Sequence, residues 1–569
     1  MENQQTKDFG VLYGQKTTED ALLIYSSYED SKASPQTGDF IVLAPRDEDG
    51  KKFLARVEAE IYDEDPIFRS QDKTLVAVHY ARIAERDLSE RDKQKMFSYT
   101  YKVKLLGSFT SDGKDFTTAV RKLPIVSYHA RHLTQREFDN IINGSNQNGK
   151  KIGSFCIGED VKNKYEVLFD VNKLKSKRTM VFAQSGFGKT NLVKGLIGNT
   201  VMDTTVGKLI FDLEGEYAFK SQKNYGLVDL KNQNFRENII VYTDKKLPSF
   251  YENIFQKSGN VKIDLGIDFS IGDLIQTAIG LTSAGRNFLE YIESLPDKKS
   301  VNDFIGKIAN NEDPKDIRRF AYTKFASYFE ASKKKEDKEI EKDISQANRA
   351  MLGGVIRQIK SYSSIHEKDS NFIKGVLNAL QEGKTVIVDM SLKDNEEASI
   401  ISTMLVKRLF ENNKKAHTPD TANDYSVIPC IIFVEEAQNV LSDEFVRSNA
   451  NPFVKIAKQG RKFDIGLVSI TQRPSAISEE IRSQAENYFV MHMSNSKDIK
   501  ALIESNIGYS GSISKFIQHE AIAGNLYMVS AKQTFVIPLR VDWFEKRVHQ
   551  SILEELKFSK EEMPGLYQC

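Results

Sequence analysis

The sequence has few cysteines and no excess of either charge. Three cysteines occur in 569 residues, and no two of them are spaced as CxxC. This scarcity indicates a reducing compartment and excludes a disulfide scaffold or a cysteine-rich zinc site. Lysine and arginine number 80 against 79 aspartates and glutamates, which gives a formal net charge of +1. Any contact with nucleic acid must therefore be local, because the chain as a whole is not basic.

Long apolar runs are absent as well. No stretch of 18 apolar residues occurs, and the first ten residues, MENQQTKDFG, lack the apolar core of a signal peptide. Neither secretion nor a membrane span is predicted, so we expect a cytoplasmic protein with no membrane partner. Hydrophobic residues make up 40% and charged residues 28%, as is typical of a folded globular chain. The length allows several domains.

The first part of the chain, residues 1–155, has short β-rich runs separated by turn-forming residues. Regularly spaced short strands of this kind predict a small β-barrel or sandwich. The strands are expected at residues 39–44, 52–57, 74–78 and 97–105.

From about residue 178 the pattern changes to apolar strands of four to six residues that alternate with helical patterns. Continuous apolar strands among helices predict an α/β fold with a mostly parallel sheet covered on both faces. These strands are expected at residues 179–182, 209–212, 386–389, 431–434, 466–470 and 488–491. We predict a core in two parts, residues 156–255 and 381–545, a helical insertion at 256–380 and a tail at 546–569.

The strongest motif is Ala183-Gln-Ser-Gly-Phe-Gly-Lys-Thr190, which lies between an apolar strand and a helical pattern. This is the context of a phosphate-binding P-loop. Its glycines let backbone N–H groups approach phosphates, the lysine reaches the β and γ oxygens, and the threonine binds Mg²⁺. We therefore expect ATP and Mg²⁺ as cofactors. The expected nucleotide-binding residues are Gly186, Phe187, Gly188, Lys189, Thr190 and Asn191.

Two details test this assignment. Ala183 replaces the first glycine of the P-loop consensus, which is tolerable if its φ is negative. Gly383-Lys384-Thr385 also reads GKT, but it follows a helical stretch and precedes the strand at 386–389. There the glycine is predicted to end a helix.

A second motif, Cys430-Ile-Ile-Phe-Val-Glu-Glu-Ala-Gln438, is an apolar strand that ends in two adjacent acids. Ligands of α/β sheets bind at the carboxyl ends of the strands. Glu435 is expected to hold Mg²⁺ through water, and Glu436 to polarise the attacking water. The alternative is that both acids form a solvated strand end or a helix N-cap.

A third acid, Asp212, ends the apolar strand at 209–212 and is followed by Glu214 and Glu216. Asp212 is the best functional candidate of these three acids, and loop solvation is the alternative for each.

Two polar residues complete the candidate site. Gln472 follows the strand at 466–470 and is suited to sensing the γ-phosphate, because an amide bonds phosphate or water without adding charge. Arg461, on a turn after Gly460, has the planar fork of an arginine finger that acts in trans. The alternative for Arg461 is a surface or DNA-phosphate contact.

In these motifs and in their order the sequence resembles the HerA family, in the FtsK–HerA division of RecA-like P-loop motor ATPases. The resemblance covers most of the chain and implies a HerA-type barrel before a RecA-like core. It implies that Lys189 and Thr190 are Walker A residues, Asp212 an active-site acid, Glu436 the catalytic glutamate, Gln472 the sensor and Arg461 the finger. Besides Ala183, one departure is Gln438, where many members have histidine.

The resemblance also implies a hexameric ring that hydrolyses ATP while translocating on or unwinding double-stranded DNA. In the family such rings work with a nuclease of the NurA type, and similar bacterial rings join sirtuin-like or nuclease effectors in antiphage complexes. The Lys- and Asn-rich composition favours the bacterial defence setting. The alternative is an ATP-regulated scaffold ring that assembles and activates an effector enzyme. A conjugation or DNA-packaging ATPase is disfavoured, because no membrane anchor is predicted.

Overall fold

The computed structural model describes most of the chain. The described residues are 8–15, 22–27, 35–62, 98–146, 148–220, 224–230, 233–246, 261–262, 265–268, 271–277, 281–329, 344–367, 369–419, 424–448, 451–531, 533 and 535–548. The strand expected at 74–78 and most of the expected tail lie outside them. The chain forms two compact units. Unit 1 comprises Met1–Lys173, Val181–Leu192 and Glu486–Trp543, and unit 2 comprises Leu174–Met180, Val193–Ala485 and Phe544–Cys569.

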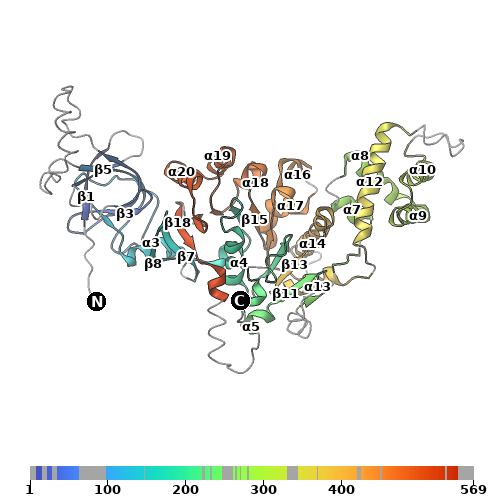
Figure 1. The fold of residues 1–569 in the computed structure, drawn as a ribbon, viewed down its shortest axis with the longest axis horizontal. Helices are drawn as coiled ribbons and strands as arrows, with labels where there is room; N and C mark the ends of the chain where they lie inside the picture. The colour runs from blue at the N-terminus through green and yellow to red at the C-terminus, as the bar shows by residue number, and fades with distance from the viewer. Residues whose placement is uncertain are drawn as a thin grey trace. The chain divides into compact units, whose positions relative to one another are not determined.

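Unit 1 begins with a closed antiparallel barrel, drawn in blue in Figure 1. Its strands follow one another around the barrel in the order β1 (Asp8–Gln15), β2 (Leu22–Ser27), β5 (Ser98–Phe109), β4 (Lys52–Tyr62), β3 (Phe40–Ala44) and β6 (His129–His132). The interior is filled by buried apolar side chains such as Phe9, Ile41 and Tyr101. The predicted N-terminal barrel is confirmed, and closure leaves it without an exposed strand edge.

The rest of unit 1 is an antiparallel set of strands with short helices. The strand order is β16 (Asn487–Val490), β17 (Asn525–Val529), β18 (Ile537–Val541), β7 (Lys150–Ile157) and β8 (Asp160–Phe169). The helices are α3 (Gln135–Ile142), α19 (Ser496–Ser505) and α20 (Ser512–His519). Residues 486–543 thus return to pair with the segment that follows the barrel, since Leu539 of β18 lies opposite Phe155 of β7.

Unit 2 contains a parallel sheet. Its strands lie in the order β12 (Val261–Lys262), β11 (Ile239–Thr243), β13 (Thr385–Asp389), β10 (Gly207–Asp212), β14 (Cys430–Val434) and β15 (Ile465–Thr471). The strands β10, β11, β13, β14 and β15 are buried along their whole length, which explains their continuous apolar sequences. The predicted α/β class with a mostly parallel sheet is confirmed.

One further strand, β9 (Arg178–Phe182), has its residues divided between the two units and leads into α4 (Lys189–Thr200). Other helices accompany the parallel strands of unit 2. They are α5 (Gln233–Glu237), α13 (Phe372–Gln381), α14 (Asn395–Ala416), α15 (Gln438–Leu441), α16 (Asp443–Ser448), α17 (Pro452–Gln459) and α18 (Glu479–Arg482). Among the residues that the structure describes, no helix is both long and apolar enough to cross a membrane.

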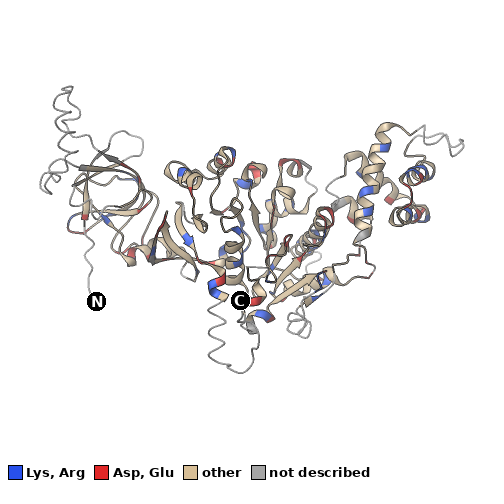
Figure 2. Cartoon of the chain, in the orientation of Figure 1, with Lys and Arg blue, Asp and Glu red and all other residues tan. Residues whose placement is uncertain are grey.

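A helical segment lies between β12 and α13, inside the range 256–380 in which a helical insertion was expected; that range also takes in β12 and most of α13. It contains α7 (Ile271–Thr277), α8 (Ser283–Ser294), α9 (Lys298–Ala309), α10 (Pro314–Lys324) and α12 (Gln346–Ser364), and Figure 2 shows both signs of charge interspersed on these helices. Its aromatic core packs edge to face around Phe288, Phe304 and Phe325. The two ends of the segment meet, because the N–H of Ile267 donates to the carbonyl of Ile365 at 2.8 Å.

Candidate functional site

The P-loop, residues 183–190, follows β9 directly. Gly186 and Gly188 have φ values of 85° and 98°, a conformation that side-chain-bearing residues rarely adopt, and α4 begins at Lys189. This is the geometry in which backbone N–H groups and a helix N-terminus face a phosphate. Ala183 is buried and is not among the residues with positive φ. The condition for replacing the first glycine of the motif is therefore met.

Residues from the end of β16 and the turn before β17 support the P-loop within unit 1. The ring of Phe187 packs on the ring of His492, with centroids 4.3 Å apart. The N–H of Gly524 donates to the carbonyl of Phe187 at 3.0 Å. A Cβ on Gly188 would lie at an ordinary contact distance of 3.5 Å from the backbone of Gly524, so Gly188 is required by its φ of 98° and not by close packing. His492 was not predicted from the sequence. The signal that could have indicated it is its position directly after the strand at 488–491.

The second GKT sequence ends a helix, as predicted. Gly383 follows α13 with a φ of 74°, and its N–H donates to the carbonyl of Leu380. The N–H of Lys384 donates to the carbonyl of Ala379, so the pair of bonds is a Schellman motif. The three letters GKT therefore have different structures at the two places, and the strand before the P-loop makes the difference.

Two acids follow β14 and have different surroundings. Glu435 is buried, and its Oε1 accepts a hydrogen bond of 2.7 Å from the hydroxyl of Tyr217. Glu436 is partly exposed and has a φ of 45°. Strained backbone of this kind costs about 1–3 kcal/mol and clusters at functional sites. The chain thus turns sharply at Glu436 and gives the two neighbouring carboxylates separate environments.

The carboxylate of Glu436 is held by two amide side chains. Nε2 of Gln438 donates to its Oε2 at 2.6 Å, and Nε2 of Gln472 donates to its Oε1 at 3.4 Å. Gln438 is itself fixed by the hydroxyl of Thr471, at 2.6 Å. The structure therefore brings together Glu436 and Gln472, both expected in the site. It also shows what Gln438 does, which is to donate to Glu436.

Asp212 is fully buried at the end of β10, where backbone groups occupy both of its oxygens. Its Oδ1 accepts from the N–H groups of Gly215 and Glu216, and its Oδ2 accepts from that of Tyr217, at 2.8 to 3.0 Å. Burial raises the pKa of Asp212 to about 6, and the neighbouring charge of Asp389 acts in the same direction. The carboxylate thus holds the loop at residues 213–217 against the strand end.

Asp389 is a buried acid of this cluster that sequence reasoning missed. It ends β13 directly opposite Asp212 in the parallel register. Its carboxylate lies 3.1 Å from Nζ of Lys245 and accepts hydrogen bonds from Thr243 and Ser391. A signal was present in the sequence, because Asp389 closes an apolar strand just as Asp212 does.

Arg461 is exposed on a single turn, Gly460–Phe463, between α17 and β15. The residue with left-handed backbone in this turn is Asp464, with a φ of 56°, and not Gly460. Glycine is needed at 460 for close packing, since a Cβ there would lie 2.7 Å from the carbonyl oxygen of Ile465. The role of Arg461 in a neighbouring subunit stays a prediction.

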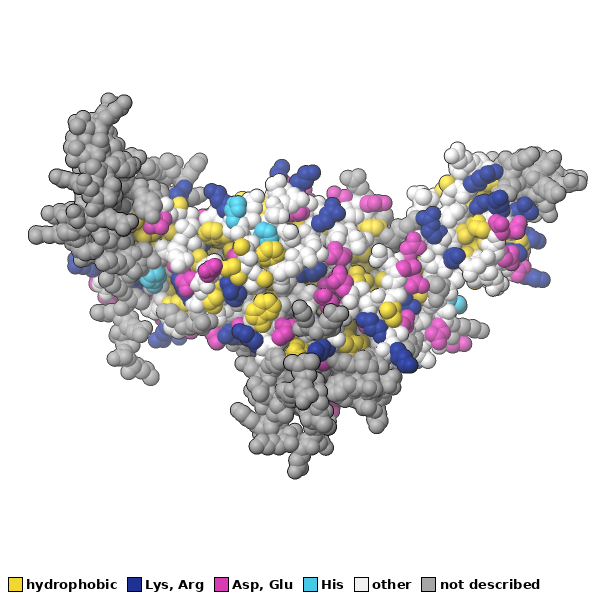
Figure 3. All heavy atoms as spheres, viewed as in Figure 1, with side chains coloured by type: hydrophobic (Ala, Val, Ile, Leu, Met, Phe, Trp, Pro, Cys, Tyr) yellow, Lys and Arg dark blue, Asp and Glu magenta, His cyan; other side chains and the backbone are white. Residues whose placement is uncertain are grey.

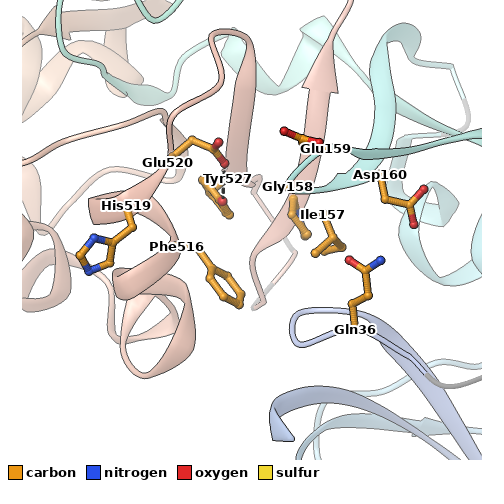
Figure 4. A pocket seen from close by; sticks show the side chains of 10 residues that line it. Gln36, Ile157, Gly158, Glu159, Asp160, Phe516, His519, Glu520 and Tyr527 are labelled. Carbon is orange, nitrogen blue, oxygen red and sulfur yellow. Dashed lines mark hydrogen bonds between the residues drawn. The ribbon is translucent and has the colours of Figure 1, made fainter. Parts of the chain in front are cut away.

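A cavity of about 370 Å³ in unit 1 is lined by residues from the β7–β8 turn, α20 and β17 (Figure 4). Three acids face it, Glu159, Asp160 and Glu520, and Glu520 accepts a hydrogen bond of 3.0 Å from the hydroxyl of Tyr527. An acidic lining repels phosphate groups, so this cavity is not suited to a nucleotide.

The residues expected to hold Mg²⁺ are of the right chemical type. The hydroxyl of Thr190 and the carboxylate of Glu435 are oxygen ligands, which Mg²⁺ prefers. In the described part of the chain, no group of three or more histidine, cysteine, aspartate or glutamate side chains is placed to hold a metal. Proteins usually bind Mg²⁺ through one or two side chains together with the phosphates of the nucleotide.

The P-loop and the acids that close parallel strands define a P-loop ATPase. Residues 152–409 match a family described as "Helicase HerA, central domain". The chain is 25% identical over 450 residues to the DNA double-strand break repair helicase HerA of Sulfurisphaera tokodaii, covering 77% of this chain and 78% of that protein. Residues 152–409 are therefore similar to the HerA central domain, and the similarity to HerA-named relatives extends over most of the chain.

Two other comparisons concern a second relative and a solved structure. A probable helicase of Methanocaldococcus jannaschii is 24% identical over 479 residues, covering 83% of this chain and 79% of that protein. The solved structure of VirB4 of Thermoanaerobacter pseudethanolicus aligns with 70% of this chain and 98% of its own, at 13% identity and a TM-score of 0.39.

Proposed function

We propose that this chain is an ATP-hydrolysing motor that translocates on double-stranded DNA or unwinds it. The observation that carries the proposal is the geometry of the P-loop, with Gly186 and Gly188 in left-handed conformations and α4 beginning at Lys189, inside a region that matches the HerA central domain. Curated relatives named DNA double-strand break repair helicases support DNA as the track.

Each polar residue of the site has a role in this proposal. The P-loop binds ATP through Gly186–Asn191, and Thr190 and Glu435 hold Mg²⁺ with the phosphates. Glu436 polarises the attacking water, and Gln472, which donates to it, senses the γ-phosphate. Arg461 of a neighbouring subunit stabilises the developing charge. Asp212 belongs to the site as the acid that fixes the loop after β10.

The proposed assembly is a homohexameric ring with ATP between subunits and DNA in its pore. The face seen in Figure 3 has basic and acidic side chains interspersed, and the net charge is +1. DNA contacts by a few lysines or arginines from each of several subunits agree with this distribution, because such contacts add up around a ring.

ATP hydrolysis with and without double-stranded DNA, measured together with mass by light scattering, tests the motor. We expect DNA-stimulated hydrolysis by a species of about six times the chain mass, since closed rings are the common way to repeat a head-to-tail interface. Lys189→Ala should abolish hydrolysis, because it removes the charge that meets the β and γ oxygens. DNA-stimulated hydrolysis that survives in this variant would overturn the site assignment.

The finer part of the proposal concerns partners. We propose a cytoplasmic ring that works with a nuclease of the NurA type or with a sirtuin-like or nuclease effector in antiphage defence. The N-terminal barrel contains none of the residues expected in the nucleotide site, and this favours a second candidate, an ATP-regulated scaffold that assembles and activates the effector. Glu436→Gln separates the two, since a scaffold ring of this variant still binds and activates its effector whereas a motor ring is inactive.

A further inference from the structure

A buried hydrogen bond links the loop after β10 to the acid expected to hold Mg²⁺. Tyr217 is fully buried, and its hydroxyl donates to Oε1 of Glu435 at 2.7 Å. The two residues are 218 positions apart in the sequence. They meet because β10 and β14 are parallel neighbours, with Phe211 opposite Val434. The tyrosine therefore reaches over the strand end from which Glu435 projects.

Asp212 determines where Tyr217 lies. Its carboxylate accepts the N–H of Tyr217 at 2.9 Å and those of the two preceding residues, and Gly215 supplies a φ of 71° in the same turn. The chain from Asp212 to Tyr217 is thus folded back on the acid that begins it. With both oxygens engaged in this way, Asp212 is a fixed support for the tyrosine.

We propose that Tyr217 is a positioning residue that orients the carboxylate of Glu435 for Mg²⁺, and that Asp212 acts through Tyr217 by fixing its loop. The inference rests on the proposed function, in which Glu435 holds the metal. Groups that bond to a metal ligand from behind fix its orientation, and their loss typically lowers metal affinity or activity about 10- to 100-fold.

The tyrosine is suited to act as a permanent donor. Burial raises the pKa of Tyr217 well above 10, and the negative charge of Glu435 acts in the same direction. The hydroxyl donates to a carboxylate at 2.7 Å. Hydrogen bonds with one ionised partner are about twice as strong as neutral ones. Glu435 is thus held in one orientation before a nucleotide arrives.

The test replaces Tyr217 by phenylalanine, which keeps the ring and removes the donor. We expect affinity for a fluorescent ATP analogue without Mg²⁺ to stay within about twofold of wild type, because the P-loop is untouched. The Mg²⁺ concentration that half-saturates tight analogue binding should rise about tenfold. A matched control is Tyr509→Phe, which also removes a fully buried hydroxyl, one that donates to the carbonyl of Tyr527 at 3.0 Å.

Two further variants show whether the effect passes through Glu435. In a Glu435→Gln background, Tyr217→Phe should produce no additional rise in the Mg²⁺ requirement. Incorporation of p-aminophenylalanine at position 217, which restores a donor, should return the requirement to within about threefold of wild type. This variant also keeps the test open if Tyr217→Phe fails to fold, as judged by its melting temperature.

The inference is overturned if Tyr217→Phe shifts the Mg²⁺ requirement no more than Tyr509→Phe does, or if its effect persists in the Glu435→Gln background. The failure of the proposed function has a different signature. In that case the wild-type protein shows no ATP hydrolysis that double-stranded DNA stimulates, whatever its Mg²⁺ requirement for analogue binding.

Discussion

The P-loop and the acidic end of β14 hold their reactive groups in different ways. The P-loop relies on backbone conformation, with two glycines at positive φ and a helix that begins at Lys189. Glu435 and Glu436 rely on side chains, since a tyrosine and two glutamines fix their carboxylates. A backbone device depends on local sequence, whereas a side-chain device depends on residues brought from elsewhere. A change at Glu436 should therefore lower turnover, whereas a change in the backbone of the P-loop should weaken ATP binding.

The largest expected effect comes from a change at Glu436, whose carboxylate is held by side chains. Glu436→Gln should lower kcat about a thousandfold, within the range for a lost general base, and leave ATP affinity nearly unchanged. Steady-state hydrolysis together with binding of a fluorescent ATP analogue checks this. An equal loss of affinity would mean that Glu436 serves the binding of ATP, and the contrast with the P-loop would fail.

A second expected effect concerns stability and pH. The pKa of Asp212 is raised in the folded state from 3.8 to about 6, mainly by burial. The raised pKa contributes roughly 3 kcal/mol to the free energy of unfolding. This contribution is fully present below pH 3.8 and is lost as the pH rises through about 6. Chemical unfolding across this range measures the free energy of unfolding of wild type and of Asp212→Asn. The value for wild type minus the value for the variant should fall as the pH rises.

Asp203→Asn is the matched control for that experiment. Burial of Asp203 is outweighed by hydrogen bonds from Thr205 and Lys175, which lower its pKa. The free energy of unfolding of wild type minus that of Asp203→Asn should therefore rise with pH over the range in which unfolded aspartate titrates. This change is opposite in sign to the one expected for Asp212→Asn. If the difference in free energy of unfolding between wild type and Asp212→Asn did not change with pH, the raised pKa assigned to Asp212 would be wrong.

The smallest expected effect comes from a change in the backbone of the P-loop. Gly188→Ala places a side chain at a φ of 98°, which costs about 1–3 kcal/mol and should weaken ATP binding by about tenfold or more. Gly195→Ala, in the middle of α4 with open space at its Cβ, should leave binding unchanged and stabilise the helix by about 1 kcal/mol. Isothermal calorimetry measures ATP binding by the two variants, and thermal unfolding measures their stability. Equal binding losses would show that any substitution near the loop has this effect.

The same contrast explains how much could be predicted from the sequence. The P-loop, the parallel strands and the helix end at Gly383 depend on patterns within a few residues, and all are found where they were expected. Glu436 and Gln472, which were both expected in the site, lie in contact with each other.

Other features could not be predicted, because their causes are not local. The bond from Tyr217 to Glu435 joins residues 218 positions apart, and the packing of His492 on Phe187 joins two separate segments of unit 1. Gly460 is glycine because the carbonyl of Ile465 approaches it, and no sequence pattern distinguishes that reason from a positive φ. Asp389 was accessible to the strand-end argument, but it carries no motif of its own.

The paired ends of the helical segment have an evolutionary consequence. Ile267 and His366 form a bridge at the base of the segment, while the helices between them pack around aromatic residues of their own. An insertion whose ends are adjacent can be lengthened, shortened or exchanged without moving the strands on either side. Changes in the length of this segment can therefore accumulate while the strands that carry the candidate site residues keep their places.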